Sequence, residues 1–331
     1  MQCRKRKANF LFVATRTQKE QFIRDNEPTI QRLSREGLDD KVIADYIDAL
    51  FNGSNSQIYN TPIDLFIEDF LFKTYQNLRP FQFLSLLSLL KEYIDAATNR
   101  QILEHTPAKI RNANIILSLT HAFQFRDLFA YDMSQLFKAT SPQMKFAKEF
   151  YADYLKYQKG NKALEAHELI RKWAKELQID AYFSLIDENE YRSKASGGVG
   201  SQSAEAEFSH FPSPPVEEEK GQGVPEDIQP EPAGQAAVIL YCLSALQYFE
   251  NKDLSEIQKV GFEIAMLGRQ GIDSAKTDKK YRLQSIPDKE VTGLQLLAYM
   301  YVAFQVIDPF LDTGLAFKTE YEEAKKMHEK R

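Results

Sequence analysis

Apolar residues recur at helical spacing along most of the chain. In one stretch they follow the i, i+3, i+4, i+7, i+8 pattern that places side chains on a single helical face. That face consists of Ile63, Phe66, Ile67, Phe70 and Leu71. A similar pattern lies between residues 146 and 157, and the sequence has no alternating runs joined by hairpin turns. The chain is therefore predicted to be all-α.

Helix start signals support this prediction. Thr61-Pro62-Ile63-Asp64 places a capping hydroxyl before a proline at the first helical position and an acid in the first turn. Ser141-Pro142 and Thr106-Pro107 repeat that opening, and residues 253–256 and 292–295 fit a capping box. The predicted helices span residues 17–35, 39–51, 61–76, 80–97, 107–128, 141–158, 161–178, 237–250, 253–269, 292–307 and 314–329.

These helices predict a multi-helix bundle or an irregular helical solenoid. Short turns between successive helices are typical of both, and no 34-residue tetratricopeptide consensus is present. Phe10–Val13 is the one stretch that resembles a short strand, and the sequence offers no obvious pairing partner for it.

Residues 193–235 interrupt the helical pattern. Of these 43 residues, six are proline, six are glycine, eight are acidic and two are basic, which gives a net charge of −6. Such a composition has too little apolar surface to offset the entropy of ordering. We therefore predict a helical domain over residues 1–192, a disordered linker or insertion over 193–235, and a C-terminal helical segment over 236–331. Because the last segment is short and very apolar, it is expected to pack on the first domain.

Composition excludes several classes of protein. The net charge is 42 − 47 = −5, so the chain is not a general nucleic-acid binder. Two cysteines, Cys3 and Cys242, rule out a disulfide framework and a cysteine-based zinc finger. No segment has 18 uninterrupted apolar residues, and no signal peptide is recognised at the start. We expect a cytoplasmic protein with no membrane span.

Most candidate chemical motifs have a simpler explanation. Gly197–Gly200 lies in the acidic segment and is no nucleotide-binding loop. Cys3 has basic neighbours but no nearby histidine, so we expect an inert thiol. The stretch His167-Glu-Leu-Ile-Arg171 falls short of the His-Glu-x-x-His zinc motif because its fifth residue is a cation. His121, in an aromatic-rich helix, is expected to be a structural histidine.

The helix that begins at Thr61 carries two carboxylates of interest. Asp64 and Glu68 are four residues apart and therefore lie on one face, beside an apolar seam. The helix dipole explains Asp64, which is near the N-terminus, but it does not explain Glu68. Two alternatives remain open for Glu68. It either meets a basic partner elsewhere in the fold or serves a metal-binding or catalytic role.

The stretch from Leu50 to Asp69 resembles a group of bacterial conserved proteins related to zinc metallopeptidases of the gluzincin type. Leu78–Phe83 and Ile286–Glu290 are also similar to that group. The resemblance implies a His-Glu-x-x-His helix followed by a glutamate from a later helix as the third zinc ligand. It implies Glu68 in that role, with Asp64 as second choice.

This sequence contains no His-Glu-x-x-His. Either Met1 is an internal methionine of a longer protein, or the catalytic half of the family has been lost. One carboxylate cannot hold zinc or activate water, so zinc is expected only together with the missing N-terminal ligands.

Two hypotheses follow. The first is a truncated or degenerate zinc metallopeptidase-like protein, which is inactive in this form and has no catalytic residue of its own. In an intact relative, zinc would polarise a peptide carbonyl and activate water. The second is a non-enzymatic helical scaffold that binds a protein partner, suggested by the 23 phenylalanines and 16 tyrosines. Such aromatic residues lie more often in a core than at an interface.

Overall fold

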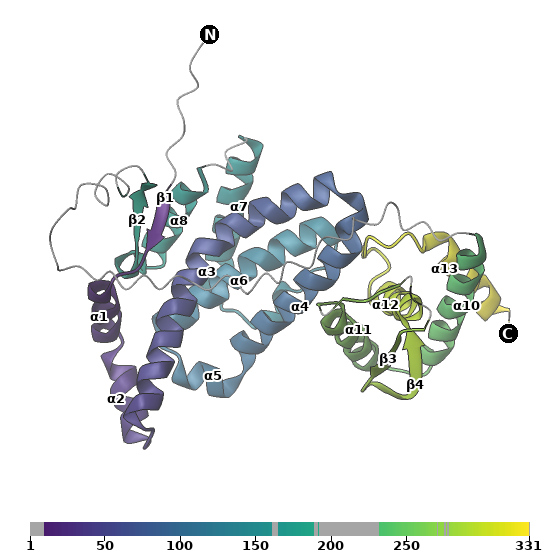
Figure 1. Cartoon of the computed structure of the whole chain (residues 1–331), viewed down its shortest axis with the longest axis horizontal. Helices are drawn as coiled ribbons and strands as arrows, with labels where there is room; N and C mark the ends of the chain where they lie inside the picture. The colour runs from purple at the N-terminus through teal and green to yellow at the C-terminus, as the bar shows by residue number, and fades with distance from the viewer. Residues whose placement is uncertain are drawn as a thin grey trace, which may run out of the picture. The chain divides into compact units, whose positions relative to one another are not determined.

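The computed structural model describes residues 10–160, 165–188, 191, 232–269, 271–274, 276 and 278–330. These residues are mainly helical, with two small antiparallel sheets (Figure 1). The all-α prediction is thereby confirmed. Among the described residues, no helix has both the length and the apolar character needed to cross a membrane.

The order of elements is as follows. The strands are β1 (Phe10–Val13), β2 (Ser184–Asp187), β3 (Lys280–Leu283) and β4 (Ile286–Thr292). The helices up to residue 182 are α1 (Arg16–Asp25), α2 (Glu27–Arg35), α3 (Asp40–Thr74), η1 (Gln76–Leu78), α4 (Arg79–Thr98), α5 (Arg100–His105), α6 (Ala108–Phe129), η2 (Ser134–Phe137), α7 (Ser141–Lys159), α8 (Ala166–Glu176) and η4 (Asp180–Tyr182). The helices after residue 231 are α10 (Pro232–Phe249), α11 (Leu254–Arg269), α12 (Gly293–Ile307) and α13 (Lys318–Glu329).

The chain divides into two compact units that do not follow sequence order. Unit 1 comprises Met1–Ile67, Ala96–His121 and Phe137–Lys220, and unit 2 comprises Glu68–Asp95, Ala122–Leu136 and Gly221–Arg331. The predicted segment 193–235 lies outside the described residues up to residue 231, and α10 begins at Pro232. The predicted domain boundaries at 192 and 236 stay a prediction.

The core of unit 1 is built on aromatic contacts. The Phe22 ring lies 5.5 Å from that of Phe51 and 5.0 Å from that of Tyr182, and Phe150 stacks on Trp173 at 4.8 Å. Strand β1 pairs antiparallel with β2. The predicted strand 10–13 is confirmed, and its partner lies so much later in the chain that no local pattern could reveal it.

Helix α3 differs from the prediction of two helices with a break at residues 52–60. It runs without interruption from Asp40 to Thr74, with Pro62 inside it. Polar residues that are typical of a loop are buried or half-buried within unit 1 and bonded to it. Asn55 Nδ2 donates to the Tyr182 carbonyl at 3.2 Å, and Gln57 Nε2 donates to Ser118 Oγ at 3.1 Å. These long-range hydrogen bonds outweigh the weak helix propensity of the segment.

Unit 2 packs around Phe83 of α4. Its ring lies 5.5 Å from Phe125, 5.2 Å from Phe129 and 5.1 Å from Phe304 of α12. Helix α12 contacts α10 and α11, and α10 contacts α13. The C-terminal helices of unit 2 therefore share one core with parts of α4 and α6.

Some of the predicted helix starts are confirmed, and others lie at a different residue from the one predicted. Asp253 and Glu256 form the reciprocal bonds of a capping box, at 2.8 Å and 3.2 Å, before α11. The cap of α7 is Thr140 instead of Ser141, because Thr140 bonds the backbone of Gln143. The hairpin of β3 and β4, paired antiparallel in unit 2, was not predicted.

A substitution at Gly293 tests the close packing at the start of α12. A Cβ atom there would lie 2.1 Å from the backbone oxygen of Asp273, which no side-chain movement can relieve. Gly293→Ala should therefore lower the free energy of unfolding by about 2 kcal/mol. Gly53→Ala is the control, since the exposed Gly53 lies inside α3 with open space around it. That change should raise the free energy by about 0.5–1 kcal/mol. Urea unfolding followed by circular dichroism measures both, and equal effects would contradict the packing at Gly293.

Candidate functional site

The two predicted carboxylates lie one turn apart on α3, and both are half-buried. In unit 2, Gln82 Nε2 donates to Glu68 Oε2 at 2.5 Å and to the Glu68 carbonyl at 2.8 Å. Glu68 thus joins the end of α3 to the start of α4. The partner of Glu68 is an amide, whereas the sequence offered a basic group or a metal as alternatives.

The described residues do not supply a zinc site around these acids. Among them, no group of three or more histidine, cysteine, aspartate or glutamate side chains is placed to hold a metal ion. Burial raises the pKa of Glu68, and the hydrogen bond from Gln82 acts in the opposite direction. The assignment of Glu68 and Asp64 as zinc ligands stays a prediction that depends on the resemblance.

The histidines noted in the sequence lie in packed surroundings. His167 stacks on Phe10 of β1 at 4.2 Å, and the Arg171 guanidinium lies 4.6 Å from the centre of the same ring. Two positions of the near-miss zinc motif therefore pack against β1. His121 is buried, and burial lowers the pKa of its imidazole to about 4, so the side chain is neutral near pH 7. Cys3 and Gly197–Gly200 lie outside the described residues.

A pocket of about 500 Å³ in unit 1 has a different chemistry. Three arginines line it: Arg32 from α2, Arg100 from α5 and Arg111 from α6. We call it the arginine pocket. Three threonines, Thr29, Thr98 and Thr106, also line it. The arginines are scattered over some eighty positions and form no local motif, so sequence analysis did not find this site.

Charge is unevenly distributed in the arginine pocket. Among the described residues, its lining includes three arginines and one carboxylate residue, Glu104. The excess of two positive charges contrasts with the net charge of −5 of the whole chain. Like charges on one concave surface raise the local potential and attract anions.

The end of helix α5 orients two of these arginines. Arg111 Nη1 donates to the Leu103 carbonyl at 2.7 Å, and Arg32 Nη2 donates to the Glu104 carbonyl. The last carbonyls of a helix lack partners within it, so these bonds give hydrogen-bond partners to the carbonyls and to the guanidinium groups. A guanidinium has five N–H donors, and each of these bonds uses one of them. Arg32 also lies 3.7 Å from Glu36, which is not part of the lining.

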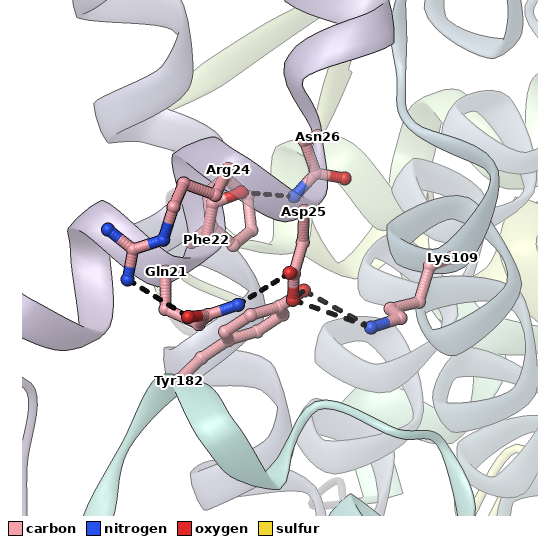
Figure 2. Close-up of polar contacts among 7 residues, drawn as sticks. All are labelled: Gln21, Phe22, Arg24, Asp25, Asn26, Lys109 and Tyr182. Atoms are coloured by element: carbon pink, nitrogen blue, oxygen red, sulfur yellow. Dashed lines mark hydrogen bonds and ion pairs between the residues drawn. The ribbon is translucent and has the colours of Figure 1, made fainter.

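A polar cluster around Asp25 links the end of α1 to the start of α6, which contributes residues to the pocket (Figure 2). Tyr182 Oη donates to Asp25 Oδ2 at 2.9 Å, and Lys109 Nζ lies 3.8 Å from the same oxygen. Gln21 Nε2 donates to Asp25 Oδ1 at 2.6 Å. Asp25 ends α1, directly before α2, and Lys109 lies in the first turn of α6. The cluster therefore fixes α2, with Arg32, relative to the start of α6.

Tyr182 is suited to this structural role. Its side chain is fully buried, and burial together with the neighbouring Asp25 carboxylate raises the pKa of its phenol. The phenol therefore stays protonated and remains a hydrogen-bond donor at physiological pH. Its bond to the Asp25 carboxylate is therefore retained across the physiological pH range.

Comparison of the chain with protein-family models, with curated proteins and with solved structures finds no match. The geometry of the site is therefore the basis for assigning a function.

The pH dependence of stability tests the role of Glu68. Because burial raises its pKa above the ordinary value of 4.5, the folded chain keeps this proton to higher pH than the unfolded chain. The stabilisation from the neutral carboxyl is complete below about pH 4.5 and is lost as the pH rises through the raised pKa. Glu68→Gln stays neutral and can still accept the bond from Gln82. Its melting temperature relative to the wild type should rise from about pH 4 to about pH 8. A constant difference would contradict this assignment.

Proposed function

We propose that this protein is a non-enzymatic helical scaffold that binds an anionic segment of a partner protein in the arginine pocket. The observation that carries the proposal is that three arginines and, among the described residues, a single carboxylate line one cavity. Arginine forks match the geometry of carboxylate and phosphate groups, and clusters of arginine recur where acidic or phosphorylated motifs are recognised.

The character of the lining favours a protein segment over a buried small molecule. Pockets for small ligands are predominantly apolar and enclose most of the ligand. Here only Leu103 and Ala108 among the lining residues are apolar. The side chains of Arg32 and Arg100 are 47% and 91% exposed. Such an open, polar pocket fits one charged side chain of a partner, with the rest of the segment outside it.

The aromatic residues that first suggested a scaffold are mostly part of the interior. Only five aromatic side chains among the described residues are exposed, namely Phe70, Tyr75, Phe81, Phe146 and Phe310. Phe70 belongs to the apolar face predicted from the sequence, and so does Ile67, which is also exposed. The scaffold hypothesis therefore rests on the arginine pocket, and the abundance of aromatic residues is explained largely by the cores.

The metallopeptidase hypothesis has its own test. The chain as given supplies Glu68 and Asp64 but no His-Glu-x-x-His. We expect the purified chain to contain less than stoichiometric zinc by elemental analysis, to show no peptidase activity, and to be unchanged in zinc content by Glu68→Gln. One zinc per chain that is lost in Glu68→Gln would instead support the metallopeptidase hypothesis.

Anion binding tests the proposed function directly. Titration calorimetry with sodium phosphate and with a short phosphoserine peptide should detect binding that weakens about tenfold in Arg100→Gln, since one charge-assisted contact is lost. Arg100 is exposed, so its replacement should leave the fold intact. The affinity should also fall as salt is added, because exposed charges are screened.

Arg16→Gln is the matched control. Arg16 forms the same kind of i, i+4 pair, with Glu20 at 3.2 Å, and its side chain is 93% exposed, but it lies on α1 outside the pocket. We expect the affinity of Arg16→Gln for both probes to stay within about twofold of that of the wild type. Equal losses in the two variants, or no binding of either probe, would contradict the proposal.

A further inference from the structure

Glu104 is the one carboxylate of the arginine pocket, and it contacts two of the three arginines. Its Oε1 accepts from Arg100 Nε at 2.6 Å, and its backbone carbonyl accepts from Arg32. The side chain of Glu104 is 55% exposed, so it can leave Arg100 without unfolding the helix. In the structure, Arg100 is thus already paired with an internal anion.

Because Arg100 is paired with Glu104, an anion of the partner must displace the Glu104 carboxylate to bind Arg100. An incoming aspartate or glutamate would replace one carboxylate at Arg100 by another of equal charge. The internal carboxylate has the advantage of an effective concentration on the order of millimolar or higher, because it is attached to the same helix turn. A single carboxylate of a partner therefore gains little by displacing Glu104.

A phosphate monoester differs in charge and in geometry. It carries about −1.5 to −2 charges near pH 7 and has three strong acceptor oxygens. With Glu104 in place, the lining has an excess of two positive charges. Three oxygens can accept from more than one guanidinium at once. A phosphate therefore gains contacts that a carboxylate does not.

We infer that the arginine pocket recognises a phosphorylated side chain of the partner, and that Glu104 is the residue that excludes unphosphorylated acidic side chains. The inference rests on the proposed function and names the group that the pocket binds. It makes association conditional on phosphorylation, because the same segment with a serine or a glutamate at that position lacks either the charge or the third acceptor oxygen.

A simpler explanation assigns these residues to helix α5 alone. Arg32 and Arg111 then serve as caps for its last carbonyls, and Arg100 with Glu104 forms an ordinary exposed helix pair. The Arg16–Glu20 pair of α1 separates the two explanations. It has the same spacing and similar exposure of both side chains but lies outside the pocket, so changes there report the general effect of charge.

The test compares four versions of one short glycine- and alanine-rich peptide with the full chain. The central position is phosphoserine, serine, glutamate, or a pair of adjacent glutamates that matches the charge of the phosphate. Calorimetry at constant ionic strength gives each dissociation constant. For the wild type we expect phosphoserine to bind at least about tenfold more tightly than the charge-matched pair of glutamates, and serine not to bind.

Variants of the two glutamates complete the test. Glu104→Gln frees Arg100, so the affinity for the glutamate peptides should rise about tenfold and the preference for phosphoserine should shrink. Glu20→Gln removes the same charge outside the pocket and should leave that preference unchanged. Both glutamates are exposed, and circular dichroism verifies that the variants are folded.

The outcomes of these titrations distinguish the phosphate inference, the role of Glu104 and the proposed function. Equal binding of phosphoserine and glutamate peptides to the wild type, with both weakened by Arg100→Gln, would overturn the phosphate inference and keep the proposed function. An unchanged preference in Glu104→Gln would overturn the role of Glu104. No binding of any peptide would overturn the proposed function as well.

Discussion

The arrangement of unit 1 depends on the contacts of one buried residue, Tyr182. Its carbonyl accepts from Asn55 in the middle of α3, and its hydroxyl donates to Asp25 at the end of α1. Its ring packs edge-on against Phe22. One residue of a short 3₁₀ turn thereby connects two helices, α1 and α3. Each of these bonds is buried or half-buried, where losing a partner costs more than it does in water.

The same contacts explain how an exposed pocket can have a defined shape. Arginine side chains at a surface are usually mobile, and ordering them costs entropy. Here the contact between Lys109 and Asp25 links α6 to α1, and the last carbonyls of α5 orient Arg32 and Arg111. The guanidinium groups are therefore partly preorganised, which lowers the cost of binding an anion. Glu104 limits the electrostatic repulsion among them while no ligand is bound.

Glu68 shows how a half-buried carboxylate that suggests chemistry can have a structural role. A glutamate beside an apolar seam is costly unless it has a partner, and this reasoning made it a candidate metal ligand. The partner in the structure is the amide of Gln82, which joins α3 to α4. The sequence indicated that Glu68 either meets a basic partner or serves a metal-binding or catalytic role. It could not identify Gln82, because an amide in the following helix carries no distinctive motif.

The sequence by itself determined the secondary-structure class and several helix ends. Helical periodicity and the capping box at Asp253 and Glu256 depend on neighbours within a few residues, so local patterns predict them. The tertiary structure decided the rest. It kept α3 continuous through a loop-like stretch, paired β1 with a distant strand and brought three scattered arginines into one pocket. Each of these features depends on contacts between residues far apart in the chain, where burial and long-range hydrogen bonds outweigh local propensity.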